Sequence, residues 1–535
     1  MHIPIPLATS LAVFGGISRL ALGVALGVAP SCAVDEGRTL DDLSVSDDTS
    51  GEQPSAMPVC TTGTIRCHAL IRTVGTSQRT SSHLTAPVGF GPPDLQQAYN
   101  IDPSNAVPAS PTVAIVDAYG YSALESDLAA YRSHYGLPTC TIANGCLETV
   151  NQQGQATPLP ANPPASDDWT IETALDVDMV SAACPRCKIL VVQATDNLGN
   201  GLYIAQNTAA ALGATVISDS WGGPEQPDTP ASSIAANEAY FDHPNIAIFV
   251  AAGDHGYNDL VVGPGNPTGP DYPGTSAHTI AVGGTHLVRD TSARGWSETT
   301  WAPTARSATG AGGSACSLSI PKPAYQTASP CPFKATTDIA AVADQATGVA
   351  VYNAGQGGWI TVGGTSASAP LVAAIFAATG NGAQASGAFI AANASKLHDV
   401  VSGTNGTCPA DRTLLCNAAV GWDGPTGHGT PNAAALASAG DPGASDGSPV
   451  VTGGCSMGRG AGTGGLLGIA LLGLRRRRPV ARPPRSSAPD ENRTRLLLID
   501  NQLASPDASG GNTSSVARRL GARTNHRTNA RRVSE

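Results

Sequence analysis

The sequence predicts an α/β fold with a mostly parallel central sheet, and two patterns support this. Short apolar, β-branched runs recur along the chain, as in Thr112-Val-Ala-Ile-Val-Asp117 and Lys188-Ile-Leu-Val-Val-Gln193. Stretches long enough for a helix separate these runs, as crossovers between parallel strands require. Continuously apolar strands are also typical of sheets covered by helices on both faces. We therefore expect one α/β domain over residues 88–439.

The individual elements of this domain can be placed in order along the chain. Further strands are expected at residues 215–218, 246–251 and 279–282, and helices at about 122–135 and 169–184. Another helix is expected immediately after Gly363-Gly-Thr-Ser-Ala-Ser-Ala-Pro370, a stretch of small residues that leaves the hydroxyl of Ser366 uncrowded.

The segments outside the domain differ from it in composition. Residues 1–33 contain the apolar run Leu20–Ala29 and are interpreted as a signal peptide. Residues 34–87 are acidic and then Ser/Thr-rich, which predicts an extended or partly disordered lead-in, interpreted as a short remnant propeptide. Residues 440–454 are rich in Gly, Ser, Asp and Pro and are interpreted as a linker.

The C-terminal end combines three features in sequence. Residues 455–478 contain Cys455, an apolar stretch and the cluster Arg475–Arg478, an order that resembles the C-terminal sorting signals of surface-anchored bacterial proteins. The alternative is a fortuitous apolar helix, since eleven apolar residues cannot cross a bilayer. Residues 479–535 are basic and patternless, which predicts a disordered tail.

Charge and cysteine content restrict the compartment and the partners. The net charge is -11, but residues 475–535 carry 14 Arg and 5 acidic residues, so the rest of the chain is strongly acidic. An acidic body repels phosphate and argues against a nucleic acid partner. Ten cysteines form five pairs of sequence neighbours, which predicts short-loop disulfides and an oxidising, extracellular location. The expected pairs are Cys60/Cys67, Cys140/Cys146, Cys184/Cys187, Cys316/Cys331 and Cys408/Cys416.

Ser366 is a candidate nucleophile, and acids are candidate partners. Glu172 and Asp176, four residues apart, lie one above the other on the predicted helix beside its apolar stripe. Such a pair repels, which raises the pKa of one acid and favours sharing of a proton, so Glu172 is a candidate base and Asp176 its partner. Asp254 follows a buried strand and, if protonated, could donate a hydrogen bond to an oxyanion.

Each of these residues also has a simpler interpretation. Ser366 could lie in a tight turn, Glu172 and Asp176 on a solvated helix face, and Asp254 in an ordinary Asp-Gly-type turn. A histidine-dependent triad of Asp117, His428 and Ser366 is a further alternative. It is disfavoured because His428 follows Ser366 by 62 residues and no helix is patterned to present it.

Together these motifs resemble the sedolisin family, the serine-carboxyl peptidases with a subtilisin-like three-layer fold. The matches occur in the family's order and are Glu172-x-x-x-Asp176, Ser218-Asp-Ser-Trp-Gly-Gly223, Ala252-Gly-Asp254-x-Gly256, Ala281-Val-Gly-Gly-Thr285 and Gly364-Thr-Ser366-Ala-Ser. The resemblance implies an endopeptidase with Ser366 as nucleophile, Glu172 as general base, Asp176 as its partner and Asp254 as oxyanion donor. Such a mechanism predicts activity at acid pH.

The resemblance also implies one structural Ca²⁺ ion. Its ligands would be the side chains of Asp399 and Asp423 and the carbonyls of Val400, Ala419 and Gly421. Carboxylates and backbone carbonyls are the ligands that Ca²⁺ prefers. A departure from the family is that residues 34–87 are too short and too polar for the usual folded pro-domain.

The sequence therefore predicts a secreted, monomeric endopeptidase that acts on proteins or peptides and is anchored to the cell surface if the C-terminal signal works. Two rivals remain at this point: a surface-displayed binding protein that lost catalysis on the same fold, and the Ser-His-Asp hydrolase described above.

Overall fold

The structure is a computed structural model that describes residues 55–73, 86–104, 110–226, 229–257, 270–302 and 310–437. All of these belong to one compact unit within residues 1–448. The predicted signal peptide, linker, sorting signal and basic tail lie outside the described residues. Within the described ranges no helix combines the length and the apolar character needed to cross a membrane.

The core of the unit is a mixed sheet of eight strands, seven of which are parallel to their neighbours. Along the sheet the order is β13, β12, β9, β7, β4, β6, β5, and β17 also pairs with β12. Only β13 runs antiparallel to its neighbour. The bounds are β4 Thr112–Ala118, β5 Leu147–Asn151, β6 Lys188–Ala194, β7 Val216–Asp219, β9 Ala247–Ala251, β12 Ile280–Arg289, β13 Trp296–Thr300 and β17 Ile339–Val342. The predicted parallel sheet is confirmed.

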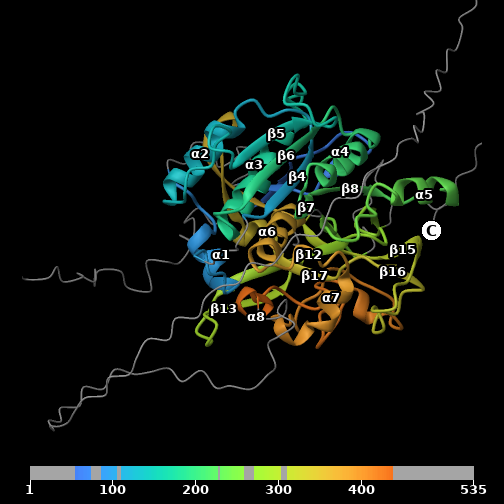
Figure 1. The fold of residues 1–535 in the computed structure, drawn as a ribbon. Helices are drawn as coiled ribbons and strands as arrows, with labels where there is room; N and C mark the ends of the chain where they lie inside the picture. Colours follow the sequence, from blue (N-terminus) through green and yellow to red (C-terminus); the bar gives the residue numbers. More distant parts are fainter. Residues whose placement is uncertain are drawn as a thin grey trace, which may run out of the picture. The chain divides into compact units, whose positions relative to one another are not determined.

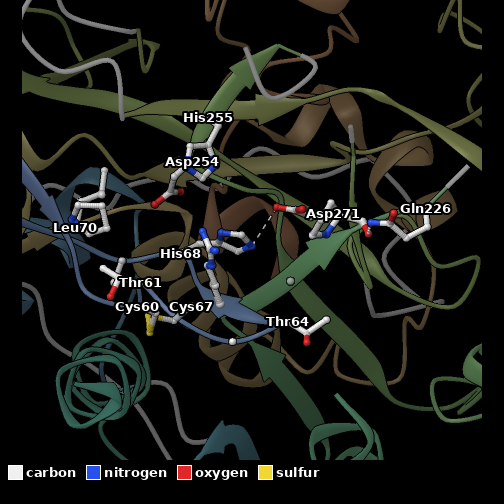
Figure 2. Close-up of a pocket in the computed structure, with 16 residues that line it drawn as sticks. Cys60, Thr61, Thr64, Cys67, His68, Leu70, Gln226, Asp254, His255 and Asp271 are labelled. Carbon is white, nitrogen blue, oxygen red and sulfur yellow. Dashed lines mark hydrogen bonds and ion pairs between the residues drawn. A yellow bond between two sulfur atoms is a disulfide. The ribbon is translucent and has the colours of Figure 1, made fainter. Parts of the chain in front are cut away.

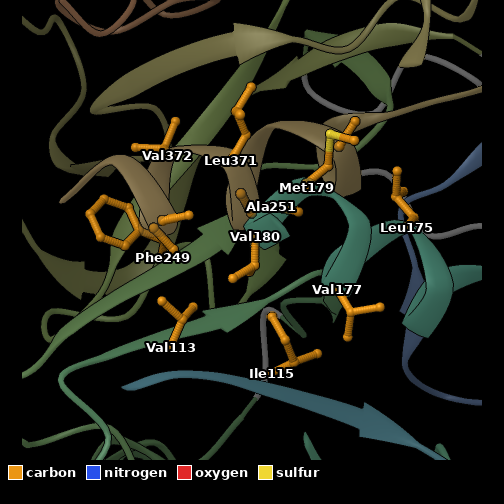
Figure 3. Close-up of a cluster of buried hydrophobic side chains, with 14 of the residues drawn as sticks. Val113, Ile115, Leu175, Val177, Met179, Val180, Phe249, Ala251, Leu371 and Val372 are labelled. Atoms are coloured by element: carbon orange, nitrogen blue, oxygen red, sulfur yellow. The ribbon is translucent and has the colours of Figure 1, made fainter. Parts of the chain in front are cut away.

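Two helices in contact with each other form the centre of the hydrophobic core. The helix α3 (Trp169–Ala183) packs against α6 (Thr365–Ala378), and both pack on strands of the sheet. Figure 3 shows side chains of both helices meeting Val113 and Ile115 of β4 and Phe249 of β9. The helix α4 (Asn200–Ala211) also packs on β4, β6 and β7. These strands are buried because helices cover them, as continuously apolar strands require.

Smaller elements complete the unit around this core (Figure 1). The remaining helices are α1 Pro92–Ala98, α2 Leu124–His134, α5 Ala231–Glu238, α7 Gly387–Ala392 and α8 Ala433–Ala437. Short strand pairs are formed by β10 (His255–Tyr257) with β14 (Ala311–Ser314) and by β15 (Cys316–Pro321) with β16 (Phe333–Ala335).

Residues 55–73, which composition assigned to a polar lead-in, are part of the folded unit. The strands β1 (Ser55–Pro58) and β3 (Leu70–Thr73) form an antiparallel hairpin. β3 continues into a four-stranded sheet with β19 (Gly358–Gly363) and β18 (Val349–Asn353). The short strand β2 (Arg66–Cys67) lies between β1 and β3 in the sequence. It pairs with β8 (Trp221–Pro224), which in turn pairs with β11 (Asp271–Tyr272). We call residues 55–73 the N-terminal hairpin.

All five predicted disulfides are present. The pairs are Cys60–Cys67, Cys140–Cys146, Cys184–Cys187, Cys316–Cys331 and Cys408–Cys416. Each bond joins cysteines that are neighbours in sequence, so each closes a short loop rather than joining distant parts of the fold.

Candidate active site

Ser366 lies in the first turn of α6, where backbone N–H groups have no partner within the helix. Gly364 precedes the helix with a φ of 100°, a conformation that favours glycine. The strand β19 ends at Gly363, so Ser366 follows a sharp turn from strand to helix. Its side chain is fully buried, and its hydroxyl donates a hydrogen bond of 3.0 Å to the carbonyl oxygen of Ser220. The expected strand-to-helix turn is therefore present.

Glu172 and Asp176 are fully buried, which contradicts the alternative of a solvated helix face. All fifteen residues of α3 are buried, so this helix has no solvent-facing side. Asp176 accepts a hydrogen bond of 2.8 Å from the hydroxyl of Ser220, the residue whose carbonyl accepts the hydrogen bond of the Ser366 hydroxyl. Ser220 thus contacts both the candidate nucleophile and the candidate acid pair.

Burial raises the pKa of Glu172 well above its ordinary value, and the neighbouring Asp117 raises it further. Ser366 and Asp176 lie close enough to Glu172 to offset part of this shift. Neither oxygen of Glu172 has a well-aligned hydrogen bond within the described part of the chain. A carboxyl group without donors in the interior keeps its proton readily and can exchange it with a neighbour.

Further acids belong to the same cluster. Burial raises the pKa of Asp176 and Asp219 well above their ordinary values, and in both groups Asp117 raises it further. Burial also raises the pKa of Asp117 itself, to about 7. Removing one proton from such a cluster opposes removal of the next, so the group titrates as a unit.

Asp254 lies on the other side of Ser366, after β9. Its Oδ1 accepts hydrogen bonds from the backbone N–H and the hydroxyl of Thr365, at 2.8 and 2.9 Å. Its Oδ2 is buried and has no hydrogen-bond partner among the described residues. Burial raises the pKa of Asp254 to about 7, although the hydrogen bonds from Thr365 oppose this shift. Below pH 7 this carboxyl group can therefore carry a proton and donate it in a hydrogen bond.

A peptide carbonyl already lies between these groups. The N–H of Ser366 donates a hydrogen bond of 3.1 Å to the carbonyl oxygen of His68, in the N-terminal hairpin. A methyl group at Gly364 would lie 2.0 Å from that oxygen and 2.7 Å from Oδ2 of Asp254. Both oxygens therefore border Gly364, and only glycine leaves room for them. This arrangement can bind an oxyanion between a helix N–H and a protonated acid.

The alternative triad of Asp117 and His428 is not assembled. Asp117 lies in the acid cluster, whereas the charges that act on His428 are those of Asp338 and Asp399. The backbone N–H of His428 bonds to the carbonyl of Asp338. No hydrogen bond or ion pair among the described residues joins His428 to Ser366 or Asp117. Asp117, a member of the disfavoured triad, acts electrostatically on Glu172 and Asp176.

The predicted calcium residues come together in two neighbouring loops. Asp399 accepts a hydrogen bond from the N–H of Gly421, and Asp423 accepts one from the N–H of Ala419. None of the hydrogen bonds among the described residues uses the carbonyl oxygens of Val400, Ala419 or Gly421. No cluster of three acidic, His or Cys side chains suited to a metal occurs in the described ranges. Two carboxylates beside free carbonyls nevertheless fit the donor set of Ca²⁺.

Sequence reasoning missed three residues that surround the site. Ser220 contacts both Ser366 and Asp176, Thr365 holds Asp254, and His68 places its backbone against Ser366. Ser220 and Thr365 could have been found from the sequence, because each lies inside one of the motifs described above and each motif follows a predicted strand or turn. No signal in the sequence pointed to His68.

Comparisons with known proteins identify relatives of the chain. The profile of the subtilase family matches residues 148–411. Kumamolisin of Bacillus sp. (strain MN-32) is 32% identical over 391 residues, covering 69% of this chain and 66% of that protein. Sedolisin of Pseudomonas sp. (strain 101) is 28% identical over 400 residues, covering 69% of this chain and 64% of that protein. The chain thus spans slightly less than two thirds of the length of these relatives.

A solved structure shows the same fold. The structure of Pseudomonas sedolisin, a serine-carboxyl proteinase complexed with two molecules of pseudo-iodotyrostatin, aligns with a TM-score of 0.54 at 27% identity. The alignment covers 66% of this chain and 98% of that one. The fold, the order of the motifs and these relatives lead to one assignment: the chain belongs to the sedolisin family, with a subtilisin-like fold.

Proposed function

We propose that the chain is a serine-type endopeptidase that forms an acyl-enzyme on Ser366. One observation carries this proposal: Ser366, at the start of a helix, is buried between the acid cluster of Glu172 and Asp176 and the unpartnered oxygen of Asp254. Family membership supports it, because both relatives and the solved neighbour come from peptidase families. The rival of a binding protein without catalysis does not explain why five acids are buried here.

In the proposed mechanism, Glu172 accepts the Ser366 proton while Ser366 Oγ attacks the peptide carbonyl. Asp176 shares the proton with Glu172, and Ser220 fixes Asp176 through its hydroxyl. The N–H of Ser366 and protonated Asp254 stabilise the oxyanion. Glu172 then returns the proton to the leaving amine, and water releases the acyl group by the reverse sequence.

An acid optimum follows from the state of Asp254. Because its pKa is raised to about 7, Asp254 loses its donor proton as the pH rises through 7. Oxyanion stabilisation is therefore present at acid pH and declines towards alkaline pH. At the acid end, the cluster of Asp117, Glu172 and Asp176 becomes fully protonated and can no longer accept the Ser366 proton.

We also propose one structural Ca²⁺, held by Asp399, Asp423 and the carbonyls of Val400, Ala419 and Gly421. When bound, the ion would neutralise the two carboxylates and join their loops. The hydrogen bonds of Asp399 to Gly421 and of Asp423 to Ala419 support this, because they already bring both carboxylates to one loop.

Export and a monomeric state are further parts of the proposal. Five disulfides support an oxidising compartment, since such bonds are rare in the cytosol. Surface anchoring depends on residues 455–478, which the structure does not describe.

The proposed activity is tested by hydrolysis of a denatured protein from pH 3 to pH 8. We expect cleavage that peaks below neutral pH, disappears in Ser366→Ala and persists in His428→Ala. A profile that peaks above neutral pH, or full activity in Ser366→Ala, would contradict the proposal. Loss of activity in His428→Ala would favour the histidine-dependent mechanism.

A further inference from the structure

Asp254 can donate to an oxyanion only if its proton lies on the oxygen that faces the oxyanion site. A carboxyl group has two oxygens, and a proton on Oδ1 would turn the lone pairs of Oδ2 toward the developing negative charge. Burial decides whether Asp254 carries a proton, but it does not decide which oxygen carries it. The groups around the two oxygens therefore determine whether this acid assists the reaction.

The main chain of Asp254 is fixed by β14 and the residue before it. Its carbonyl oxygen accepts the N–H groups of Gly310 and Ala311, at 3.2 and 3.1 Å. The carbonyl oxygen of Gly253, the preceding residue, accepts the N–H of Gly313 at 2.7 Å. Because the backbone is held at both residues, the carboxyl group can change its position only through its own side-chain torsions.

Thr365, the residue before Ser366, supplies two hydrogen-bond donors to one oxygen of Asp254. Its backbone N–H and its hydroxyl both reach Oδ1, at 2.8 and 2.9 Å. The N–H is available because α6 begins at Thr365, so it has no partner within the helix. Both side chains are buried, so bulk water does not compete for these bonds. Oδ2 has no partner among the residues that the structure describes.

A third group sets the direction of the Thr365 hydroxyl. The backbone N–H of Gly253 donates to Thr365 Oγ1 at 3.1 Å. A backbone N–H cannot accept a hydrogen bond, so this contact leaves the hydroxyl hydrogen for another acceptor. Oδ1 of Asp254 is the acceptor that this hydroxyl reaches. The hydrogen bonds thus run in one direction, from Gly253 through Thr365 to Oδ1.

A count of donors and acceptors then places the proton of Asp254. If the proton lies on Oδ2, both donors of Thr365 keep Oδ1 as their acceptor. If it lies on Oδ1, it competes for space with the two hydrogens already directed at that oxygen, and a buried donor is left without an acceptor. Such a donor costs free energy. The arrangement therefore favours the proton on Oδ2.

Oδ2 borders the position where an oxyanion would bind. A methyl group at Gly364 would lie 2.7 Å from Oδ2 and 2.0 Å from the carbonyl oxygen of His68. That carbonyl accepts the backbone N–H of Ser366. Asp254 and His68 also line one cavity of about 450 Å³ (Figure 2). A proton on Oδ2 and the N–H of Ser366 are thus directed at neighbouring positions.

We propose that Thr365 is a positioning residue of the proposed reaction: it keeps Oδ1 of Asp254 as an acceptor, so that Oδ2 presents the proton to the oxyanion. This inference rests on the proposed function and names the group that makes Asp254 an effective donor. Thr365 acts through Asp254 and not on the substrate. Loss of its hydroxyl should therefore lower kcat and leave KM nearly unchanged.

Thr365 also limits the pH range of activity. Its hydrogen bonds favour the charged form of Asp254 and so oppose burial, which raises the pKa of this acid to about 7. Without the hydroxyl, the pKa of Asp254 should rise further. The donor proton would then persist to higher pH, so the alkaline limit of activity should move up while the maximal rate falls. A merely structural role of Thr365 would not produce these two opposite changes.

The other titratable groups around Asp254 remain the same when Thr365 is changed. Glu172 of α3 interacts electrostatically with Asp254. The cavity beside Asp254 is also lined by Arg66, His68, His255 and Asp271. Burial lowers the pKa of His68 to about 3 and also lowers that of His255, so both are neutral where Asp254 titrates.

The test removes the hydroxyl and measures kcat and KM on a peptide substrate from pH 3 to pH 9. The full-length chains compared are wild type, Thr365→Val, Thr365→Ser, Thr361→Val and Ser366→Ala. Thr365→Ser keeps the hydroxyl and should rescue both properties. Thr361→Val is the matched control, because Thr361 is a buried threonine whose hydroxyl bonds to the carbonyl of Val88. Thermal melting reports the fold of each chain.

In Thr365→Val we expect kcat at its optimum to fall by about tenfold, less than on removal of the donor itself. The alkaline limit should move up by about half a pH unit or more. Thr365→Ser and Thr361→Val should match wild type in both. An unchanged kcat or an unchanged alkaline limit in a folded Thr365→Val chain would overturn this inference alone. Absence of Ser366-dependent cleavage in wild type would overturn the proposed function instead.

A second variant covers the case in which Thr365→Val fails to fold. Thr365→Ala removes the hydroxyl without placing a methyl group against Asp254, and it should change kcat and the alkaline limit in the same directions. In an Asp254→Asn background the same substitution should leave the alkaline limit where it is, because the amide has no proton to lose. A shift in that background would contradict the role given to Asp254.

Discussion

The molecule contains two pairs of acids that the sequence singled out, and their surroundings differ. Glu172 and Asp176 lie in a buried helix, and the two oxygens of Glu172 have no aligned donor in the described part of the chain. Asp399 and Asp423 lie in loops, and backbone N–H groups donate to both. Burial raises the pKa of both acids of the first pair and also that of Asp423, to about 7, so the second pair is distinguished by the backbone carbonyls beside it, which Ca²⁺ prefers as ligands. The same residue type is thus suited to proton transfer in one place and to metal binding in the other.

The largest effect should come from removing the proposed base. Glu172→Gln keeps the shape of the side chain but cannot accept the Ser366 proton, so kcat should fall by about 10³-fold to 10⁴-fold. Steady-state kinetics on a peptide substrate measures this. Asp178→Asn is the matched control, because Asp178 is a buried acid of the same helix that bonds to the N–H of Tyr352. Loss of activity in the control but not in Glu172→Gln would contradict the assignment.

Removing the proposed oxyanion donor should have a smaller effect. Asp254→Ala should lower kcat by about 10²-fold to 10³-fold. Asp254→Asn keeps a donor that does not titrate, so its activity should extend to higher pH than that of the wild type, whose Asp254 has a pKa raised to about 7. The pH profile of kcat separates the two variants. Identical alkaline limits in Asp254→Asn and wild type would count against this role.

The loop acids should act through Ca²⁺ on stability rather than on chemistry. At a Ca²⁺ concentration of 100 times its Kd, the ion should add about 2.7 kcal/mol to the free energy of unfolding. Asp399→Asn should remove most of this gain, while Asp411→Asn, which changes an exposed acid outside the proposed site, should keep it. Thermal melting with Ca²⁺ or a chelator measures the gain. A melting temperature that is the same with Ca²⁺ and with a chelator would refute the site.

The last effect concerns the pH dependence of stability. Folded Asp117 keeps its proton up to about pH 7, whereas in the unfolded chain it loses it near 3.8. Its contribution to stability is therefore full at acid pH and is lost as the pH rises from 3.8 through 7. The slope should be about -1.4 kcal/mol per pH unit for this one group. In Asp117→Asn the denaturation midpoint should vary less with pH over that range. A pH dependence equal to that of the wild type would contradict the place of Asp117 in the acid cluster.

Much of the fold followed from local patterns. The strands at residues 112, 188 and 246 were predicted because buried parallel strands are continuous apolar runs. The disulfides were predicted because each joins sequence neighbours. The helix α3 was expected to be amphipathic, but α1, α2, α6 and β4 all pack on it, so both of its acids are buried. Periodicity reports which residues are apolar and cannot report how many neighbours surround a helix.

The hairpin could not be predicted from composition. Residues 55–73 lack a long apolar run, and they gain partners from parts of the chain far along the sequence, among them β8, β19 and Trp301. The proximity of Asp117 to the acid pair could not be predicted for a related reason. The packing of α3 on β4 brings the end of this strand beside the helix, which places Asp117 with Glu172. Such contacts arise from topology rather than from local sequence.

The central claim is that a carboxyl group, and not a histidine, activates Ser366. Its most direct test is the rate at which an activated ester acylates Ser366 from pH 3 to pH 8, measured by mass spectrometry. We predict that Glu172→Gln abolishes the adduct while His428→Ala leaves its rate unchanged. An adduct that forms normally in Glu172→Gln and is lost in His428→Ala would contradict the claim.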